Sequence, residues 1–116
     1  MSLGPDEYYP SVYVHAGEAI DITPDENLHA GAVVIVEDIV GVTKRPIAAG
    51  ETGALHLVGV FWVAKKASDG TIDQGELVYW HPDDGCTKTD TGAKKLGYAA
   101  ADAVEADTSM LVRLSP

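Results

Sequence analysis

Four residues around one predicted turn carry side chains that could do chemistry: His81, Asp83, Asp84 and Cys86. Imidazole, carboxylate and thiol groups are common metal ligands, and a hairpin could direct two or three of them toward one ion. The sequence lacks the Cys-x-x-Cys or His-x-x-x-His pair that would complete such a site. The intervening Pro-Asp-Asp-Gly is also what a tight turn ending on a left-handed glycine requires. We therefore interpret this cluster as a turn and expect no cofactor and no metal.

Cys86 is the single cysteine, so no intramolecular disulfide can form. As a nucleophile it would need a positioned base, and His81 across the turn has no evident third group to orient it. The acidic residues Asp21, Asp25 and Glu26 lack the Asp-x-Asp-x-Asp-Gly order of a calcium loop. No P-loop and no Gly-x-Ser-x-Gly motif is present. The sequence therefore offers no constellation typical of an enzyme.

The charge balance indicates which partners to exclude. The 116 residues include 18 Asp and Glu against 8 Lys and Arg, a formal net charge of −10. An acidic surface repels phosphate backbones, which argues against binding to nucleic acid. No apolar run reaches the length of a membrane span, so we expect no membrane partner either.

The element that organises the chain is the apolar run Leu55–Val63, which we predict to be a strand. One alternation phase holds Leu55, Leu57, Phe61 and Val63, and the other holds Val58, Val60 and Trp62. A strand that is apolar on both phases must be covered on both faces, and a chain this short builds only a thin core. We expect Val58, Val60 and Trp62 to be covered by another layer of the same domain or, as a subunit interface, by another copy.

Composition favours strands throughout, because Val, Ile, Thr and Tyr dominate the apolar runs. We predict an all-β protein, a small β-barrel or β-sandwich with at most one or two short helices. The predicted strands cover residues 12–15, 19–23, 30–36, 39–43, 55–63, 77–80, 86–91, 95–99 and 109–114. Residues 86–91 form a polar, exposed edge strand in this prediction, and residues 99–106 could form one helical turn.

The two halves of the chain resemble each other. Gly41, Thr52 and Leu55 recur 56 positions later as Gly97, Thr108 and Leu111. Gly31 and Val34 recur 44 positions later as Gly75 and Val78, so the second half carries twelve extra residues, around the loop 81–94. We predict two similar strand units packed on each other within a single β domain, residues 12–116.

Residues 1–11 precede this domain and do not alternate like a strand. Two prolines and a glycine disfavour a helix, which leaves a disordered tail as the simplest interpretation. Tyr8, Tyr9 and Tyr13 could instead provide contact area, because aromatic side chains are enriched at interfaces. We therefore predict a flexible N-terminal arm that orders against a partner.

The order of short motifs resembles a family of small tailed-phage and prophage proteins. The matching pieces are Ala-Gly-Glu-Ala-Ile-Asp-Ile-Thr-Pro (16–24), Ala-Gly-Ala-Val-Val-Ile-Val (30–36), Ile-Val-Gly-Val-Thr (39–43), Ile-Ala-Ala-Gly-Glu-Thr-Gly (47–53), Gly-Val-Phe (59–61), Lys65, Gln-Gly-Glu-Leu-Val-Tyr-Trp (74–80) and Leu-Gly-Tyr-Ala (96–99). These are the capsid decoration, or cement, proteins similar to the phage lambda head protein D, some of them mislabelled as RecA-like recombinases. The resemblance covers residues 12–114, with Ala64 where the family usually has proline.

This resemblance implies a non-enzymatic protein that binds the outside of the expanded head shell and stabilises it. It also implies a homotrimer at threefold positions and the major capsid protein as partner. The protein would be in the host cytoplasm before assembly and on the virion capsid surface afterwards. The alternative that we consider is another structural virion component, such as a head–tail joining or tail-tube barrel. A small enzyme or ligand-binding barrel is a third possibility.

Overall fold

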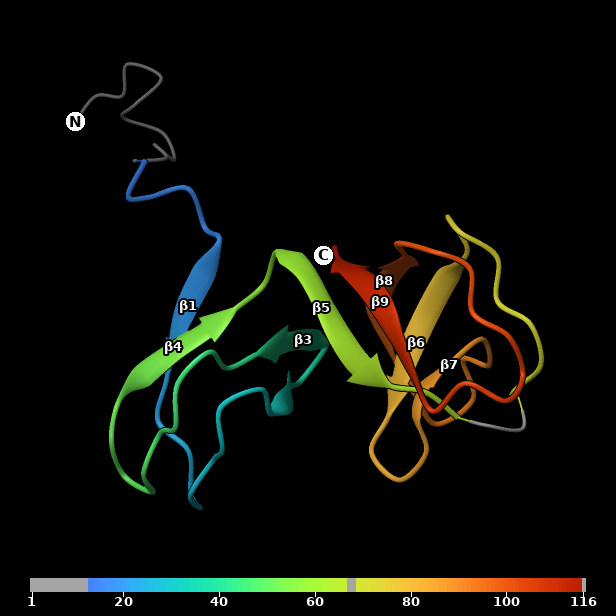
Figure 1. Cartoon of the computed structure of the whole chain (residues 1–116). Coiled ribbons are helices and arrows are strands. Elements are labelled where there is room, and N and C mark those ends of the chain that lie inside the picture. Colours follow the sequence, from blue (N-terminus) through green and yellow to red (C-terminus); the bar gives the residue numbers. More distant parts are fainter. Residues whose placement is uncertain (1–12, 67–68, 116) are drawn as a thin grey trace.

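The computed structural model describes residues 13–66 and 69–115, which form two antiparallel sheets with essentially no helix (Figure 1). The four-stranded sheet has the order β1-β4-β3-β2, and the five-stranded sheet has the order β5-β9-β8-β6-β7. The strands are β1 Ala19–Ile22, β2 Val33–Val36, β3 Ile39–Val42, β4 Gly53–His56, β5 Gly59–Ala64, β6 Leu77–His81, β7 Gly85–Thr87, β8 Lys94–Ala99 and β9 Ser109–Leu114. This confirms the all-β prediction, in a sandwich-like arrangement whose sheets do not close into a barrel.

The two sheets repeat the same topology. The first sheet has the order β1-β4-β3-β2, and the second sheet begins with the same pattern, β5-β9-β8-β6. Each strand of the first sheet therefore has a counterpart at the same place in the second. Strand β7, which pairs with β6 in a hairpin, is the addition, and it lies within the twelve extra residues of the second half. The predicted duplication of strand units is therefore present in the fold.

The loops repeat as closely as the strands. Leu28 forms an isolated bridge with Ile47, and Ile72 forms the corresponding bridge with Ala103. In the first unit the Glu51 carboxylate accepts a hydrogen bond from the Ala48 backbone, at 3.2 Å. In the second unit the Asp107 carboxylate accepts one from the Val104 backbone, at 2.8 Å. A carboxylate thus closes the Ala/Gly-rich loop in both units.

The repeated glycine of each unit is explained by close packing. A Cβ atom on Gly41 would lie 2.6 Å from Leu55 Cγ and 2.8 Å from the His56 carbonyl oxygen. A Cβ atom on Gly97 would overlap the carbonyl oxygen of Arg113 on β9. In both units the neighbouring strand therefore crosses where a side chain would stand, which only glycine allows.

The core draws on both sheets. Val40 and Val42 of β3 pack in one cluster with Leu96 of β8 and with Met110, Val112 and Leu114 of β9. Val112 is completely buried, and burying a valine side chain stabilises the fold by roughly 1.5–3 kcal/mol. The alternation of β9 is regular, since Met110, Val112 and Leu114 are buried while Ser109 and Arg113 are exposed.

The prediction of one long strand over Leu55–Val63 is wrong. The run divides into β4 and β5, which belong to different sheets, and the chain passes from one sheet to the other at Leu57–Val58 (Figure 1). Gly59 begins β5 with a φ of 126°, a conformation that side-chain-bearing residues rarely adopt. Apolar alternation continues across the junction, so periodicity alone could not reveal it.

Three smaller predictions are also wrong. Tyr13–His15 form no strand, and they lie outside both sheets. Residues 99–106 form no helical turn, because Ala103 is held by its bridge to Ile72. Strand β7 is an edge strand as expected but is buried, because the backbone of Lys65 and Lys66 lies against Cys86. The arm 1–11, with Tyr8 and Tyr9, lies outside the described residues.

Candidate interaction surfaces

One face of the five-stranded sheet is open and rich in aromatic and apolar side chains. Its rows follow from the strand register. Val60 on β5 lies opposite Arg113 on β9, Arg113 lies opposite Tyr98 on β8, and Tyr98 lies opposite Leu77 on β6. Trp62 and Leu111 form a second row across β5 and β9. We call these six residues, Val60, Trp62, Leu77, Tyr98, Leu111 and Arg113, the outer face.

The exposure of β5 follows the two phases of the sequence. Trp62 is 70% exposed and Val60 56% exposed, whereas Val63, on the opposite phase, is 5% exposed. Val58, just before β5, is also exposed. The side chains predicted to need a second layer therefore lie uncovered on this chain, and none of the other described elements supplies that layer.

The composition of the outer face is that of a protein-contact surface. Tryptophan, tyrosine and arginine are the residues that dominate interface energetics, and large exposed apolar patches mark interaction sites. Lys95 adds a cation to the same region, with its Nζ atom 5.4 Å from the centre of the Tyr98 ring. β5 is also an edge strand, and β7 meets its free edge only at the C-terminal end, near Lys65, so partner contacts can extend around the rest of that edge.

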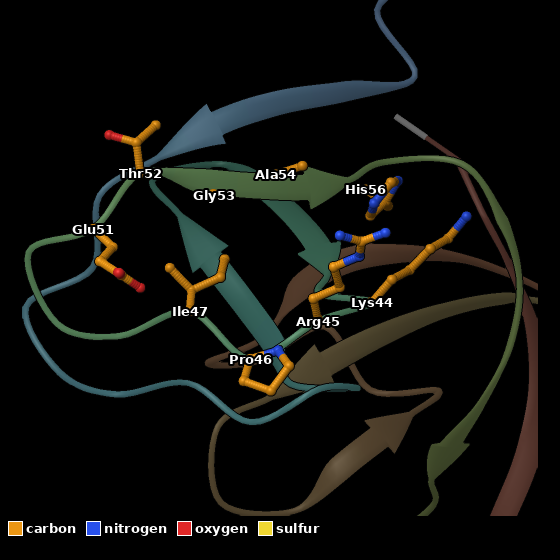
Figure 2. A pocket seen from close by; sticks show the side chains of 9 residues that line it. All are labelled: Lys44, Arg45, Pro46, Ile47, Glu51, Thr52, Gly53, Ala54 and His56. Carbon is orange, nitrogen blue, oxygen red and sulfur yellow. The ribbon is translucent and has the colours of Figure 1, made fainter.

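A groove on the four-stranded sheet, the first groove, has a different character. It has a volume of about 550 Å³. Its lining residues are Lys44, Arg45, Pro46, Ile47, Glu51, Thr52, Gly53, Ala54 and His56. Figure 2 shows Lys44, Arg45 and His56 at one end of the groove and Glu51 at the other. The first groove therefore presents basic side chains on a molecule whose overall charge is strongly negative.

A second groove, of about 370 Å³, lies at the corresponding place in the second unit. It is lined by Trp62 and by residues 101–103 and 106–111. Seven of the residues that line the first groove, 45–47 and 51–54, recur 56 positions later in the lining of the second. Asp102 and Asp107 now occupy the positions of Pro46 and Glu51. The two grooves are thus equivalent in the fold and opposite in charge.

The turn cluster does not form a reactive site. The Cys86 thiol is buried, and burial raises its pKa to about 12, with a further rise from the nearby negative charge of Asp69. A thiol with so high a pKa is a poor nucleophile. The His81 ring nitrogen Nδ1 accepts a hydrogen bond from the Asp83 backbone at 3.1 Å and lies 3.8 Å from Asp84 Oδ2. His81 therefore stabilises the β6–β7 turn through the Asp83 backbone, and Asp84 forms an ion pair with Lys66 at 3.7 Å.

Among the described residues, no group of three or more His, Cys, Asp or Glu side chains is arranged to hold a metal ion. In the same part of the chain, no helix has the length and apolar character needed to cross a bilayer.

The sequence identified Val58, Val60 and Trp62 as a group, and the structure places all three at or near the exposed side of β5. Tyr13, the third residue of the predicted arm contact, is 81% exposed and belongs to no strand. Sequence reasoning missed Arg113, Tyr98 and Leu77 as neighbours of Val60. The alternation of residues 109–114 contained a signal, because it places Arg113 on the outward phase.

The fold and these surfaces define a small all-β protein with an open aromatic and apolar sheet face and two grooves of opposite charge. The family model described as phage cement protein matches residues 14–114, and the chain therefore belongs to the phage cement protein family. Proteins of this family are structural components associated with the phage capsid. No curated protein and no solved structure matches the chain.

Proposed function

We propose that this chain is a non-enzymatic decoration protein that binds the outer surface of the phage head shell and stabilises it. The observation that carries the proposal is the outer face, with Trp62 70% exposed, on a member of the cement protein family. An isolated soluble chain gains nothing by exposing such a residue, whereas a partner that covers it gains a large apolar contact.

The partner in this proposal is the major capsid protein of the cognate phage. The chain acts as a homotrimer at a threefold position of the shell, and part of the surface formed by Val58, Val60 and Trp62 lies between subunits. Residues 1–11 act as a flexible arm on the single β domain 12–116, and Tyr8, Tyr9 and Tyr13 contact the capsid. The protein resides in the host cytoplasm until it joins the virion.

Co-sedimentation with expanded, empty shells of the cognate phage tests this function. The wild-type chain is expected to pellet with the shells to a fixed number of copies per shell. Thr91→Ala, at an exposed position in the loop before β8, is the matched control and is expected to pellet equally. If saturating wild-type protein stays in the supernatant, the proposed function is wrong.

A further inference from the structure

The first groove contains two cations that have no partner within the described chain. Lys66 is within 3.7 Å of Asp84, Lys94 donates to Asp38 at 3.0 Å, and Lys88 donates to the Thr71 carbonyl at 2.9 Å. Lys44 and Arg45, by contrast, are exposed and have no hydrogen bond or ion pair with another described residue. Two adjacent free cations, with the half-buried His56 beside them, fit an acidic partner.

The acidic counterpart is present on the same chain, in the loop that borders the second groove. Asp102, Glu105 and Asp107 lie within six residues of one another. The Asp102 carboxylate accepts a hydrogen bond from the Gln74 backbone at 2.7 Å, and Asp107 closes the loop, but the Glu105 side chain is exposed. The buried Lys65 Nζ donates to the Glu105 carbonyl at 3.4 Å, but because the loop has three carboxylates against this one cation, it retains a net negative charge.

The two surfaces lie too far apart to meet within one molecule. The loop before β4 is at one end of the structure, and the loop between β8 and β9 is at the other (Figure 1). We propose that the first groove of one copy receives the acidic 102–107 loop of a second copy, with Arg45 facing Glu105. This inference rests on the proposed homotrimer and names the residues that would join its subunits.

Three observations support a second copy as the occupant. The charges are complementary, and a contact between opposite charges offsets the repulsion between copies that each carry a net charge of −10. The second groove includes Trp62, so the acidic loop is continuous with the outer face. Finally, two different surfaces on each copy give a head-to-tail contact, which closes into a ring when the rotation permits.

Charge reversal provides the test, because the Arg45 and Glu105 side chains hold no described hydrogen bond that the fold would lose. Sedimentation velocity of the free protein and shell pelleting are measured for Arg45→Glu, Glu105→Arg and the double variant. We expect each single variant to raise the dissociation constant of the trimer at least about tenfold. The double variant, which restores opposite charges, is expected to return within about threefold of wild type.

Thr91→Glu and Asp90→Arg, which introduce a negative and a positive charge at exposed positions outside both grooves, are the controls and are expected to behave as wild type. Single variants that match these controls, or a double variant no better than the weaker single one, would overturn the inference. If wild-type protein still pellets with shells in that event, the contact between copies is wrong but the proposed shell binding is not contradicted.

A cross-linking measurement covers the case in which copies meet only on the shell. The variant Arg45→Cys/Glu105→Cys is bound to expanded shells and treated with a short bismaleimide, to which the buried Cys86 is inaccessible. Covalent dimers and trimers are expected. If the bound protein remains monomeric on a denaturing gel while a lysine-reactive cross-linker joins the copies, the contact lies elsewhere.

Discussion

Trp62 and Leu111 lie opposite each other on β5 and β9, and they point away from the core that the adjacent residue Val63 enters. The same strand therefore places one large side chain in solvent and the next in the interior. This alternation separates two roles of β5, assembly and folding, that can be tested at neighbouring positions.

Trp62→Asp is expected to leave the β fold intact and to weaken association between copies. A tryptophan at the centre of an interface contributes roughly 2 kcal/mol or more, which corresponds to a loss of about thirtyfold in affinity. Light scattering measures the assembly state, and far-ultraviolet circular dichroism measures the fold.

The neighbouring variant Val63→Asp is the control, since it buries a carboxylate in the core and is expected to unfold the chain. If Trp62→Asp also abolished the β signal, Trp62 would have a structural role that its exposure does not reveal.

Much of the fold could be predicted from local patterns. Ser109–Leu114 has the bounds expected from its alternation, and the matches of Gly41 with Gly97 and of Gly31 with Gly75 correctly indicated two similar units. Each signal depends on a side chain that faces the core, on a glycine beneath a neighbouring strand, as at Gly41 and Gly97, or on a glycine with positive φ, as at Gly31 and Gly75.

The remaining errors arise where contacts between distant parts of the chain determine the local structure. The apolar run around Leu57 and Val58 reads as continuous strand, yet it carries the chain from one sheet to the other. The alanine-rich segment 99–106 has good helix propensity, yet Ala103 pairs with Ile72 instead. Likewise, the first groove exists only because the loop before β4 brings its lining residues together. Neither Lys44 nor His56 indicates this groove in the sequence.

Gly97→Ala is expected to destabilise the protein by about 2–4 kcal/mol, because the new methyl group would overlap the Arg113 carbonyl and force β8 away from β9. Gly50→Ala is the matched control. It has a φ of 81° but no atom within 4 Å of the added Cβ, so we expect a cost of about 1 kcal/mol from backbone conformation alone. Urea denaturation measures both. Equal losses at the two positions would show that strand packing around Gly97 relaxes freely.

Cys86 is expected to make stability fall in alkaline solution. Its pKa is raised from 9.0 to about 12 in the folded protein, chiefly by burial. The thiol is protonated in both the folded and the unfolded chain below pH 9, so its full contribution to the free energy of unfolding is present there. Between about pH 9 and 12 the unfolded chain releases a proton that the folded chain retains, and the free energy of unfolding falls by up to about 1.4 kcal/mol per pH unit.

Cys86→Ala isolates this effect from the titration of lysine and tyrosine side chains. Its free energy of unfolding is expected to fall less steeply than that of wild type over the same pH range, as measured by urea denaturation. Parallel curves for the two proteins would mean that the thiol ionises equally well in both states.

The central claim, that the protein binds and stabilises the head shell, is tested most directly by the heat resistance of cognate phage heads that lack it. DNA release on heating is followed by dye fluorescence before and after purified protein is added back. We predict that saturating wild-type protein raises the release temperature and that Trp62→Asp raises it less. An unchanged release temperature with wild-type protein bound to the heads would contradict the stabilising role.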